Sequence, residues 1–141
     1  MPSYDTNNIF AKILRGEVPS YKVFEDERTF AFLDIMPQAP GHTLVIPKAP
    51  ARNILDVAPD DLANLIKMTQ WIAKRAVAVF AADGVNVFQF NEPAAGQTVF
   101  HLHFHVIPRK QGVPLKPAAS IKEDAAVLAD QARQLAAALK G

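Results

Sequence analysis

Residues Ala94–Pro108 read Ala-Ala-Gly-Gln-Thr-Val-Phe-His-Leu-His-Phe-His-Val-Ile-Pro, and they hold three of the four histidines of the chain. Histidines alternate strictly with Leu102, Phe104 and Val106 in this stretch. Because successive side chains of a β-strand point to opposite faces, the pattern predicts a strand with all three imidazoles on one face. Alternate residues would lie about 6.6 Å apart along it. The sequence therefore predicts a row of imidazoles held in place by an apolar second face.

Composition sets the class of protein. The chain has 141 residues, half of them apolar, with 21% charged residues, a formal net charge of +1 and no cysteine. These numbers predict one soluble domain over 1–141, with cytoplasmic localisation, without disulfides or thiolate zinc sites. They give no reason to expect a nucleic-acid partner. No run of 18 apolar residues occurs, so no membrane partner is expected either.

The remaining elements follow from periodicity and from turn residues. Apolar residues at helical spacing predict helices, and alternating or continuous apolar runs predict strands. The expected order is a helix over 8–15, strands over 21–25, 29–33 and 43–46, a helix over 59–82, a strand over 85–90, the histidine strand, and a helix over about 120–140. Hairpin neighbours favour an antiparallel sheet, which long helices must cover. The predicted class is α+β.

Three helix boundaries are predicted from capping residues. Pro59 suits the first position of the long helix, and Gly84 is expected just beyond its C-terminal end near residue 82. Ser120, with Glu123 three residues later, forms a capping box for the last helix.

Two chemical interpretations of the histidines stay open on residue physics alone. Zinc accepts neutral imidazoles, and His42 could add a ligand, but the outer two histidines of the row start about 13 Å apart. The other interpretation is nucleophilic attack on phosphorus by the central His103, flanked by two helpers. The turn carrying Gly96, Gln97 and Thr98 would then supply donors to phosphate oxygens.

The segment from Gly96 to Ile107 resembles the signature of the histidine triad (HIT) superfamily, in its Hint-like bacterial hydrolase branch. The similarity extends over about residues 5–110 and includes 8–20, 32–35 and 40–47, in the order the family has them. It implies a five-stranded antiparallel sheet packed with helices. It also implies a homodimer in which two such sheets join into one of ten strands, with the 59–82 helix in the interface.

The resemblance also implies roles for individual residues. His103 would be the nucleophile, with its far nitrogen fixed by the backbone carbonyl of His101. His105 would contact the α-phosphate and assist the leaving group, and the His101 side chain would pair with His42 behind the site. Asp34 would accept hydrogen bonds from the ribose. The base pocket and the phosphate surroundings would be formed by Ile9, Phe10, Ile13, Phe32, Leu33, Ile35, Asn91, Gly96, Gln97, Thr98 and Val99.

The implied activity is hydrolysis or transfer at the α-phosphate of a purine nucleotide through a nucleotidyl-histidine, without metal or cofactor, giving an AMP-like product. A phosphoramidase is the first expectation and a dinucleoside polyphosphate hydrolase the second. Rival classes are a metal-dependent hydrolase and a non-catalytic nucleotide-binding or scaffold protein. Asn8 and Ala11 stand where many bacterial relatives have a zinc-binding cysteine pair. The loop between Asn91 and Gly96 is one residue shorter than usual, with Pro93 in place of a glycine.

Overall fold

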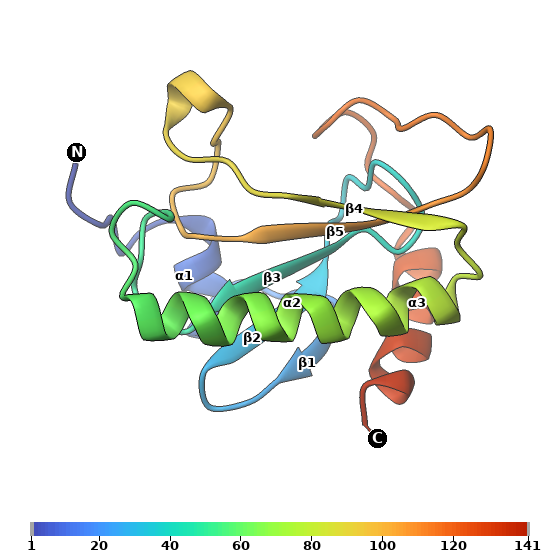
Figure 1. Ribbon diagram of the computed structural model, residues 1–141, viewed down its shortest axis with the longest axis horizontal. Helices are drawn as coiled ribbons and strands as arrows, with labels where there is room; N and C mark the ends of the chain where they lie inside the picture. Colours follow the sequence, from blue (N-terminus) through green and yellow to red (C-terminus); the bar gives the residue numbers. More distant parts are fainter. Residues whose placement is uncertain (1, 141) are drawn as a thin grey trace.

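The computed structural model describes residues 2–140, which form one antiparallel sheet flanked by helices (Figure 1). The sheet has five strands in the order β1-β2-β3-β5-β4. The strands are β1 (Lys22–Glu25), β2 (Thr29–Leu33), β3 (Thr43–Pro47), β4 (Gly84–Phe88) and β5 (Phe104–Arg109). The helices are α1 (Ile9–Leu14), α2 (Pro59–Val79), the 3-10 turn η1 (Pro93–Ala95) and α3 (Ala125–Ala138). The predicted α+β class and element order are confirmed.

The two faces of the sheet carry different layers. The larger core lies on the face covered by α2 and α3, and it includes Leu65, Ile72 and Leu135. On the opposite face, α1 contributes Phe10 to a smaller cluster of aromatic and aliphatic side chains. The cross-strand register Phe32–Leu44–His105–Phe88 places His105 on this second face, because residues in register share a face. The second face therefore carries the site.

The histidine row lies at one end of β5. Regular pairing starts at Phe104, so His101 and His103 precede the strand rather than lie within it. The apolar alternation is nevertheless present, since Leu102, Phe104 and Val106 are all buried in the larger core.

The predicted start of α2 at Pro59 is confirmed, but the predicted C-terminal end of α2 and the predicted cap of the last helix are wrong. The helix α2 ends at Val79, three residues before the predicted boundary, and Ala81 adopts the left-handed conformation (φ 49°) while Gly84 opens β4. The helix α3 is capped by Asp124, whose carboxylate accepts the amide of Ala126. A carboxylate next to the first helical turn is a good acceptor, so the helix starts later than a Ser120 cap would place it. Among residues 2–140, no helix is long and apolar enough to cross a membrane.

Gly41 lets the chain enter β3 next to the end of α2. Its φ is +84°, and a Cβ at this position would lie 2.6 Å from the ring of Phe80. Any side chain here would clash, so glycine is required for the close approach. This approach fixes where His42, the next residue, enters the sheet.

Candidate active site

A cavity of about 340 Å³ lies on the α1 face of the sheet. It is walled on one side by apolar side chains of α1, β2 and β3, and on the other by the histidine row. Its lining includes most of the predicted base-pocket and phosphate residues: Ile9, Phe10, Ile13, Phe32, Leu33, Asp34, Ile35, Thr98, Val99, His103 and His105. One side is thus apolar and the other carries imidazoles, as a bound molecule with a flat apolar part and a reactive polar part requires.

His103 presents an unprotonated ring nitrogen to this cavity. Its Nδ1 lies 2.6 Å from the carbonyl oxygen of His101, which can only accept, so Nδ1 carries the proton and Nε2 keeps its lone pair. The ring is held edge-on against Phe10, with centroids 4.9 Å apart. Burial lowers the pKa of His103 below 6.5, so the imidazole is neutral at pH 7. The predicted link to the His101 carbonyl is confirmed, and it leaves Nε2 available as a nucleophile.

His105 is fixed in the opposite protonation pattern through His42. The amide of Gln38 donates to Nδ1 of His42 (3.1 Å), so the His42 proton is on Nε2. This Nε2–H points to Nδ1 of His105 at 2.9 Å, and the His105 proton is therefore on Nε2. Burial is the main cause that lowers the pKa of His42 to about 4 and of His105 to about 3. A neutral His105 thus offers an N–H donor, and its ring centroid is 5.0 Å from that of His103.

The His101 side chain does not pair with His42, and that prediction is wrong. Its Nε2 lies 2.8 Å from the carbonyl oxygen of Pro47, and its Nδ1 lies 2.6 Å from the hydroxyl of Tyr4. The ring is fully buried, and burial lowers its pKa to about 4. These two contacts hold the His101 ring against β3 and the N-terminal segment, outside the cavity lining.

Asp34 lies at the end of β2 and lines the cavity. Its Oδ1 accepts the amide of Met36 (2.9 Å), and its Oδ2 lies 3.7 Å from Nε2 of His42. Burial raises its pKa above 3.8. The carboxylate therefore has acceptor capacity directed to the site besides its role in the turn.

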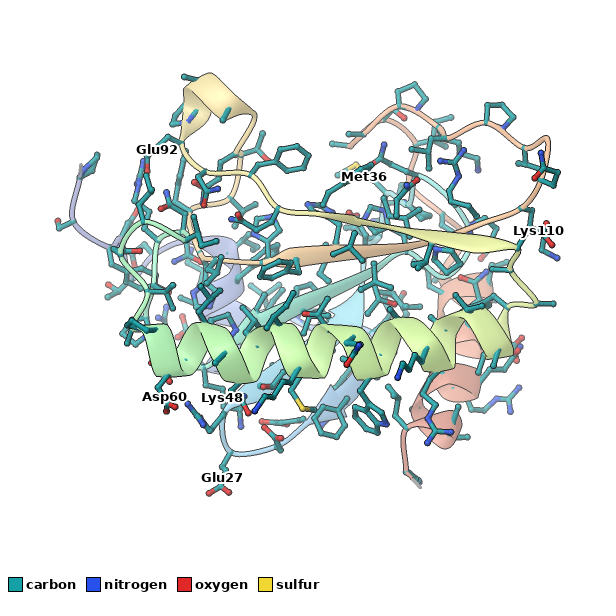
Figure 2. The ribbon with its side chains drawn as sticks, viewed as in Figure 1. Glu27, Met36, Lys48, Asp60, Glu92 and Lys110 are labelled. Carbon is teal, nitrogen blue, oxygen red and sulfur yellow. The ribbon has the colours of Figure 1, made fainter. Side chains whose placement is uncertain are left out.

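The loop between β4 and β5 is held by a network of charged and amide side chains. Glu92, labelled in Figure 2, accepts both Nε (2.7 Å) and an Nη (3.0 Å) of the buried Arg52. Asn53 donates to the same carboxylate and to the Gln97 side chain. Glu92 has a φ of 73°, a backbone conformation uncommon for a residue with a side chain. The two-point contact with Arg52 holds this residue, and with it the loop, in one conformation.

Asn91, Gly96 and Gln97 shape this loop and do not line the cavity. Both ends of the Gln97 amide are used, by Glu92 and Asn53 on the oxygen and by Arg52 and Val99 on the nitrogen. The backbone amides of Gly96 and Gln97 donate to carbonyls of η1 and its N-cap. Asn91 accepts the amide of Ile54. Of the predicted phosphate residues, Thr98 and Val99 are those that face the cavity.

A metal ion does not fit the one cluster of possible ligands found among residues 2–140. Asp34, His42 and His105 each offer an atom, and these atoms lie within 4.8 Å of one another. A metal would need the lone pair of Nε2 of His42. The Gln38 amide donates to Nδ1, which places the ring proton on Nε2. If that proton moved to Nδ1, the Nδ1–H of His42 would face the N–H of Gln38, and two donors would meet. The donor set favours hydrogen bonding over metal coordination.

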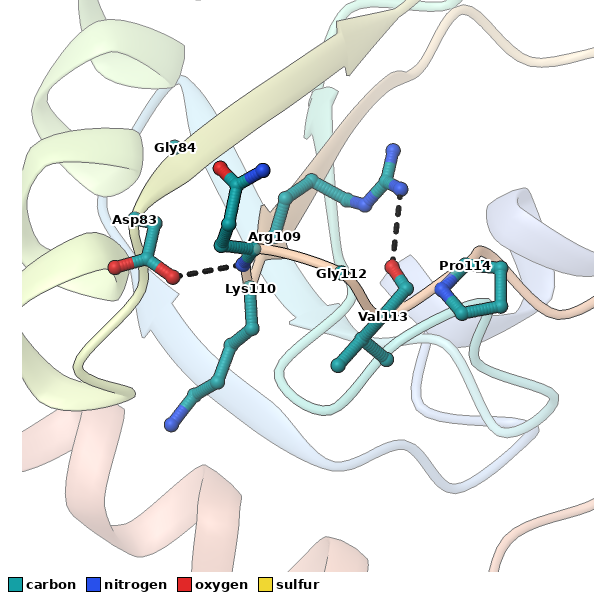
Figure 3. A pocket seen from close by; sticks show the side chains of 8 residues that line it. Asp83, Gly84, Arg109, Lys110, Gly112, Val113 and Pro114 are labelled. Carbon is teal, nitrogen blue, oxygen red and sulfur yellow. Dashed lines mark hydrogen bonds between the residues drawn. The ribbon is translucent and has the colours of Figure 1, made fainter.

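A second hollow, of about 490 Å³, lies at the far end of β4 and β5 (Figure 3). Its polar groups are largely paired with each other, since Asp83 accepts the amide of Gln111 and Arg109 donates to the carbonyl of Val113. No histidine lines it. The groups able to carry out chemistry therefore gather in the first cavity.

Several residues at the site were not predicted from the sequence. Tyr4, Gln38 and Pro47 fix the histidine protons, and Ala119 of the segment after β5 lines the apolar end of the cavity. Gln38 and Pro47 act through main-chain groups, which the identity of a residue does not reveal. Tyr4 and Ala119 are distant in sequence from their partners, and no local pattern marks them.

Comparisons with known proteins find relatives over most of the chain. The family model described as HIT domain matches residues 15–112. A solved structure of a Hit-like protein involved in cell-cycle regulation from Bartonella henselae is 52% identical, with a TM-score of 0.92, over 97% of this chain and 99% of that one. The uncharacterized HIT-like protein MJ0866 of Methanocaldococcus jannaschii is 45% identical over 74% of this chain and 80% of its own.

Relatives that are named for an activity include one from yeast and one from a plant. Adenosine 5'-monophosphoramidase HNT1 of Saccharomyces cerevisiae is 41% identical over 75% of this chain and 65% of its own. Adenylylsulfatase HINT3 of Arabidopsis thaliana is 33% identical over 94% of this chain and 67% of its own.

Proposed function

Because the chain belongs to the HIT domain family, we propose that it is a nucleotide hydrolase that cleaves at the α-phosphate of an adenosine nucleotide, with phosphoramidates as its best substrates. The observation that carries the proposal is the pair of opposite tautomers, a lone pair on His103 Nε2 next to a proton on His105 Nε2. The activities in the names of the yeast and plant relatives support it.

The proposed reaction has two displacements at phosphorus. Nε2 of His103 attacks the α-phosphorus and the bond to the amine nitrogen breaks, while that nitrogen takes the proton of His105 Nε2. The adenylyl-His103 ring is then a cation, and the His105 ring beside it is an anion that accepts the Nε2–H of His42. Water then attacks the adenylyl-histidine and gives its proton to the deprotonated His105 nitrogen. AMP leaves, and both imidazoles return to their starting protonation. The His101 carbonyl stabilises the charge that develops on the His103 ring through the Nδ1–H.

The charges at the cavity favour an amine over a polyphosphate as the leaving group. No lysine or arginine is among the residues that line it, within 2–140. Arg52 belongs to the loop network, and its Nε and one Nη already donate to the carboxylate of Glu92. A departing polyphosphate would therefore lack a cation, whereas an amine needs only the proton that His105 holds. A dinucleoside polyphosphate hydrolase remains the second candidate, through the same His103 chemistry.

The nucleoside would lie over the apolar end of the cavity. Its base would pack between α1 and β2, on Ile9, Phe10 and Phe32, and its ribose hydroxyls would donate to Asp34. The phosphate would lie against Thr98 and Val99, within reach of His103. Ile13, Leu33 and Ile35 complete the apolar wall.

The first experiment is hydrolysis of adenosine 5'-phosphoramidate by the full chain. We expect AMP and ammonia as products, unchanged turnover in the presence of EDTA, and a loss of at least about 10³-fold in kcat for His103→Ala. Calorimetric titration with AMP should show that the variant still binds nucleotide. Turnover that EDTA abolishes would favour the metal-dependent alternative, and AMP binding without turnover in the wild type would favour a binding or scaffold protein.

We also propose the homodimer that the resemblance implies. The strand β4 is at the edge of the sheet, with Val87 44% exposed, and Ile66 of α2 is 45% exposed. The two side chains line one groove between α2 and β4. An exposed edge strand beside apolar side chains is suited to pair with a second copy and extend the sheet to ten strands. Analytical ultracentrifugation should give a dimer for the wild type and a monomer for Val87→Asp with Ile66→Asp.

A further inference from the structure

A third cavity, of about 270 Å³, lies between the C-terminal end of α2, the loop that precedes β3 and the segment that follows β5. Its walls are mostly apolar and include Phe80, Pro108 and Val113, whereas Arg109, Lys110 and Lys116 bring positive charge to it. We refer to it as the cation-rimmed cavity. Within residues 2–140 it shares no lining residue with the cavity that holds His103 and His105. It is therefore a separate site.

The three cations of this cavity have no carboxylate partner within the part of the chain that the structure describes. Lys110 and Lys116 take part in no ion pair. Arg109 donates to a side-chain amide oxygen (2.6 Å) and to a main-chain carbonyl (3.2 Å), and both acceptors are neutral. Asp83 belongs to the adjoining hollow and does not line this cavity. The local excess of positive charge favours an anion as the occupant.

The walls of the cavity are held in place by hydrogen bonds. The amide of Lys116 donates to the carbonyl of Gln38 (2.9 Å), and Nε2 of Gln38 donates back to the carbonyl of Lys116 (3.1 Å). Across the cavity, Arg109 is fixed by the carbonyl of Val113, a contact that Figure 3 shows from the adjoining hollow. A site whose walls are already ordered loses little conformational entropy when a ligand enters.

Apolar surface in the cavity adds a second requirement for the occupant. Val113 is 54% exposed, and the ring of Phe80 is half-buried in the same wall. Covering such surface stabilises a complex only if the ligand is itself apolar. The volume is at the lower end for ligand pockets, so the occupant is small. Inorganic phosphate meets the charge requirement and lacks the apolar one.

We propose that the cation-rimmed cavity binds a small organic anion with an apolar body, of the class of an aryl or alkyl carboxylate. The carboxylate would lie at the rim, near the two lysines and Arg109, and the apolar body would cover Phe80 and Val113. This binding site does not depend on the proposed hydrolase activity.

The test is a titration of the full chain with naphthalene-2-carboxylate, followed by two-dimensional amide NMR. We expect the amides of Val113 and Lys116 to shift. The neutral 2-naphthamide should bind about tenfold more weakly. In the double variant Lys110→Gln, Lys116→Gln this ratio should fall to about threefold or less, since only Arg109 remains. Lys74→Gln, a change of an exposed lysine on α2, is the matched control and should keep the ratio.

A second variant tests the apolar wall. Val113→Asp removes apolar surface and adds a negative charge, so naphthalene-2-carboxylate should bind at least about tenfold more weakly. Thermal melting checks that each variant folds.

Several results would overturn the proposal. Equal affinity for the carboxylate and the amide would remove the anion preference, and equal affinity for inorganic phosphate would remove the role of the apolar wall. Shifts confined to Thr98 and Val99 would place the probe in the nucleoside cavity instead. Shifts of Val113 that follow protein concentration and not the probe would mean that a second copy covers the site. Absence of any shift up to about 5 mM probe would show that no such site exists.

Discussion

The rings of His101 and His103 are two residues apart in the chain but have different surroundings. Both nitrogens of His101 are bound, to the Pro47 carbonyl and to the Tyr4 hydroxyl, and the ring lies away from the cavity. His103 uses only Nδ1 for the main chain and lines the cavity with the rest of its ring. The difference shows that a histidine becomes available for chemistry when the protein forms a hydrogen bond with only one of its two ring nitrogens.

Besides the loss expected for His103→Ala, the largest effect is expected at His105, the other histidine that lines the cavity. For His105→Ala we expect adenosine 5'-phosphoramidate turnover to fall about 10²–10⁴-fold, because the amine then leaves without a proton donor. The 4-nitrophenyl ester of AMP should lose much less, since nitrophenolate leaves without protonation. Equal losses on both substrates would contradict the role of His105 as acid.

The loop network gives the next effect. For Arg52→Met we expect kcat/KM to fall about 10–100-fold and the melting temperature to drop, because Glu92 loses its two-point partner and Thr98 and Val99 lose their fixed position. Arg133→Met, which removes an exposed pair with Asp130 on α3, is the matched control and should change neither quantity. An active, stable Arg52→Met would show that the network does not position the site.

These assignments show which parts of the molecule the sequence predicts. Local pattern and resemblance predict three features: the order of helices and strands along the chain, the buried alternation of Leu102, Phe104 and Val106, and the link between His103 and the His101 carbonyl. The partners of the His101 and His42 side chains do not. They depend on main-chain groups of Pro47 and Gln38, brought close by the fold, and backbone groups look the same in every sequence.

The pH dependence is the third test. Burial lowers the pKa of His42 and His101 to about 4 and of His105 to about 3, whereas an unfolded histidine titrates near 6.5. Below pH 6.5 the unfolded chain therefore binds protons that the folded chain does not. The free energy of unfolding therefore keeps its full value above pH 6.5. It falls as the pH decreases from 6.5 through the folded pKa values of about 4 and 3.

Urea denaturation at pH 7.5, 6 and 5 measures this slope. We expect the midpoint to decrease steadily over the series, and to decrease less in His101→Gln, which lacks one of the shifted groups. An identical decrease in both proteins would show that His101 does not contribute. Turnover should begin to fall only at a pH lower than an ordinary histidine would give, because burial lowers the pKa of His103.

The smallest effect is expected at Tyr4. Tyr4→Phe removes the hydroxyl that donates to Nδ1 of His101, and leaving this buried nitrogen unpaired should cost about 1 kcal/mol in the free energy of unfolding. Since Pro47 still holds the other nitrogen, kcat should change less than about twofold. A large loss of kcat at unchanged stability would mean that His101 takes part in the chemistry.

The most direct test of the central claim is to trap the intermediate on His103. The wild-type protein is mixed with adenosine 5'-phosphoramidate, quenched in alkali within milliseconds, where a phosphorus–nitrogen bond to imidazole survives, and digested for peptide mass spectrometry. We predict an adenylyl group on the peptide that contains His103, assigned to that ring by fragmentation, and none in His103→Ala. Rapid turnover without any adduct, or an adduct on His101 or His105, would contradict the assignment of His103 as the nucleophile.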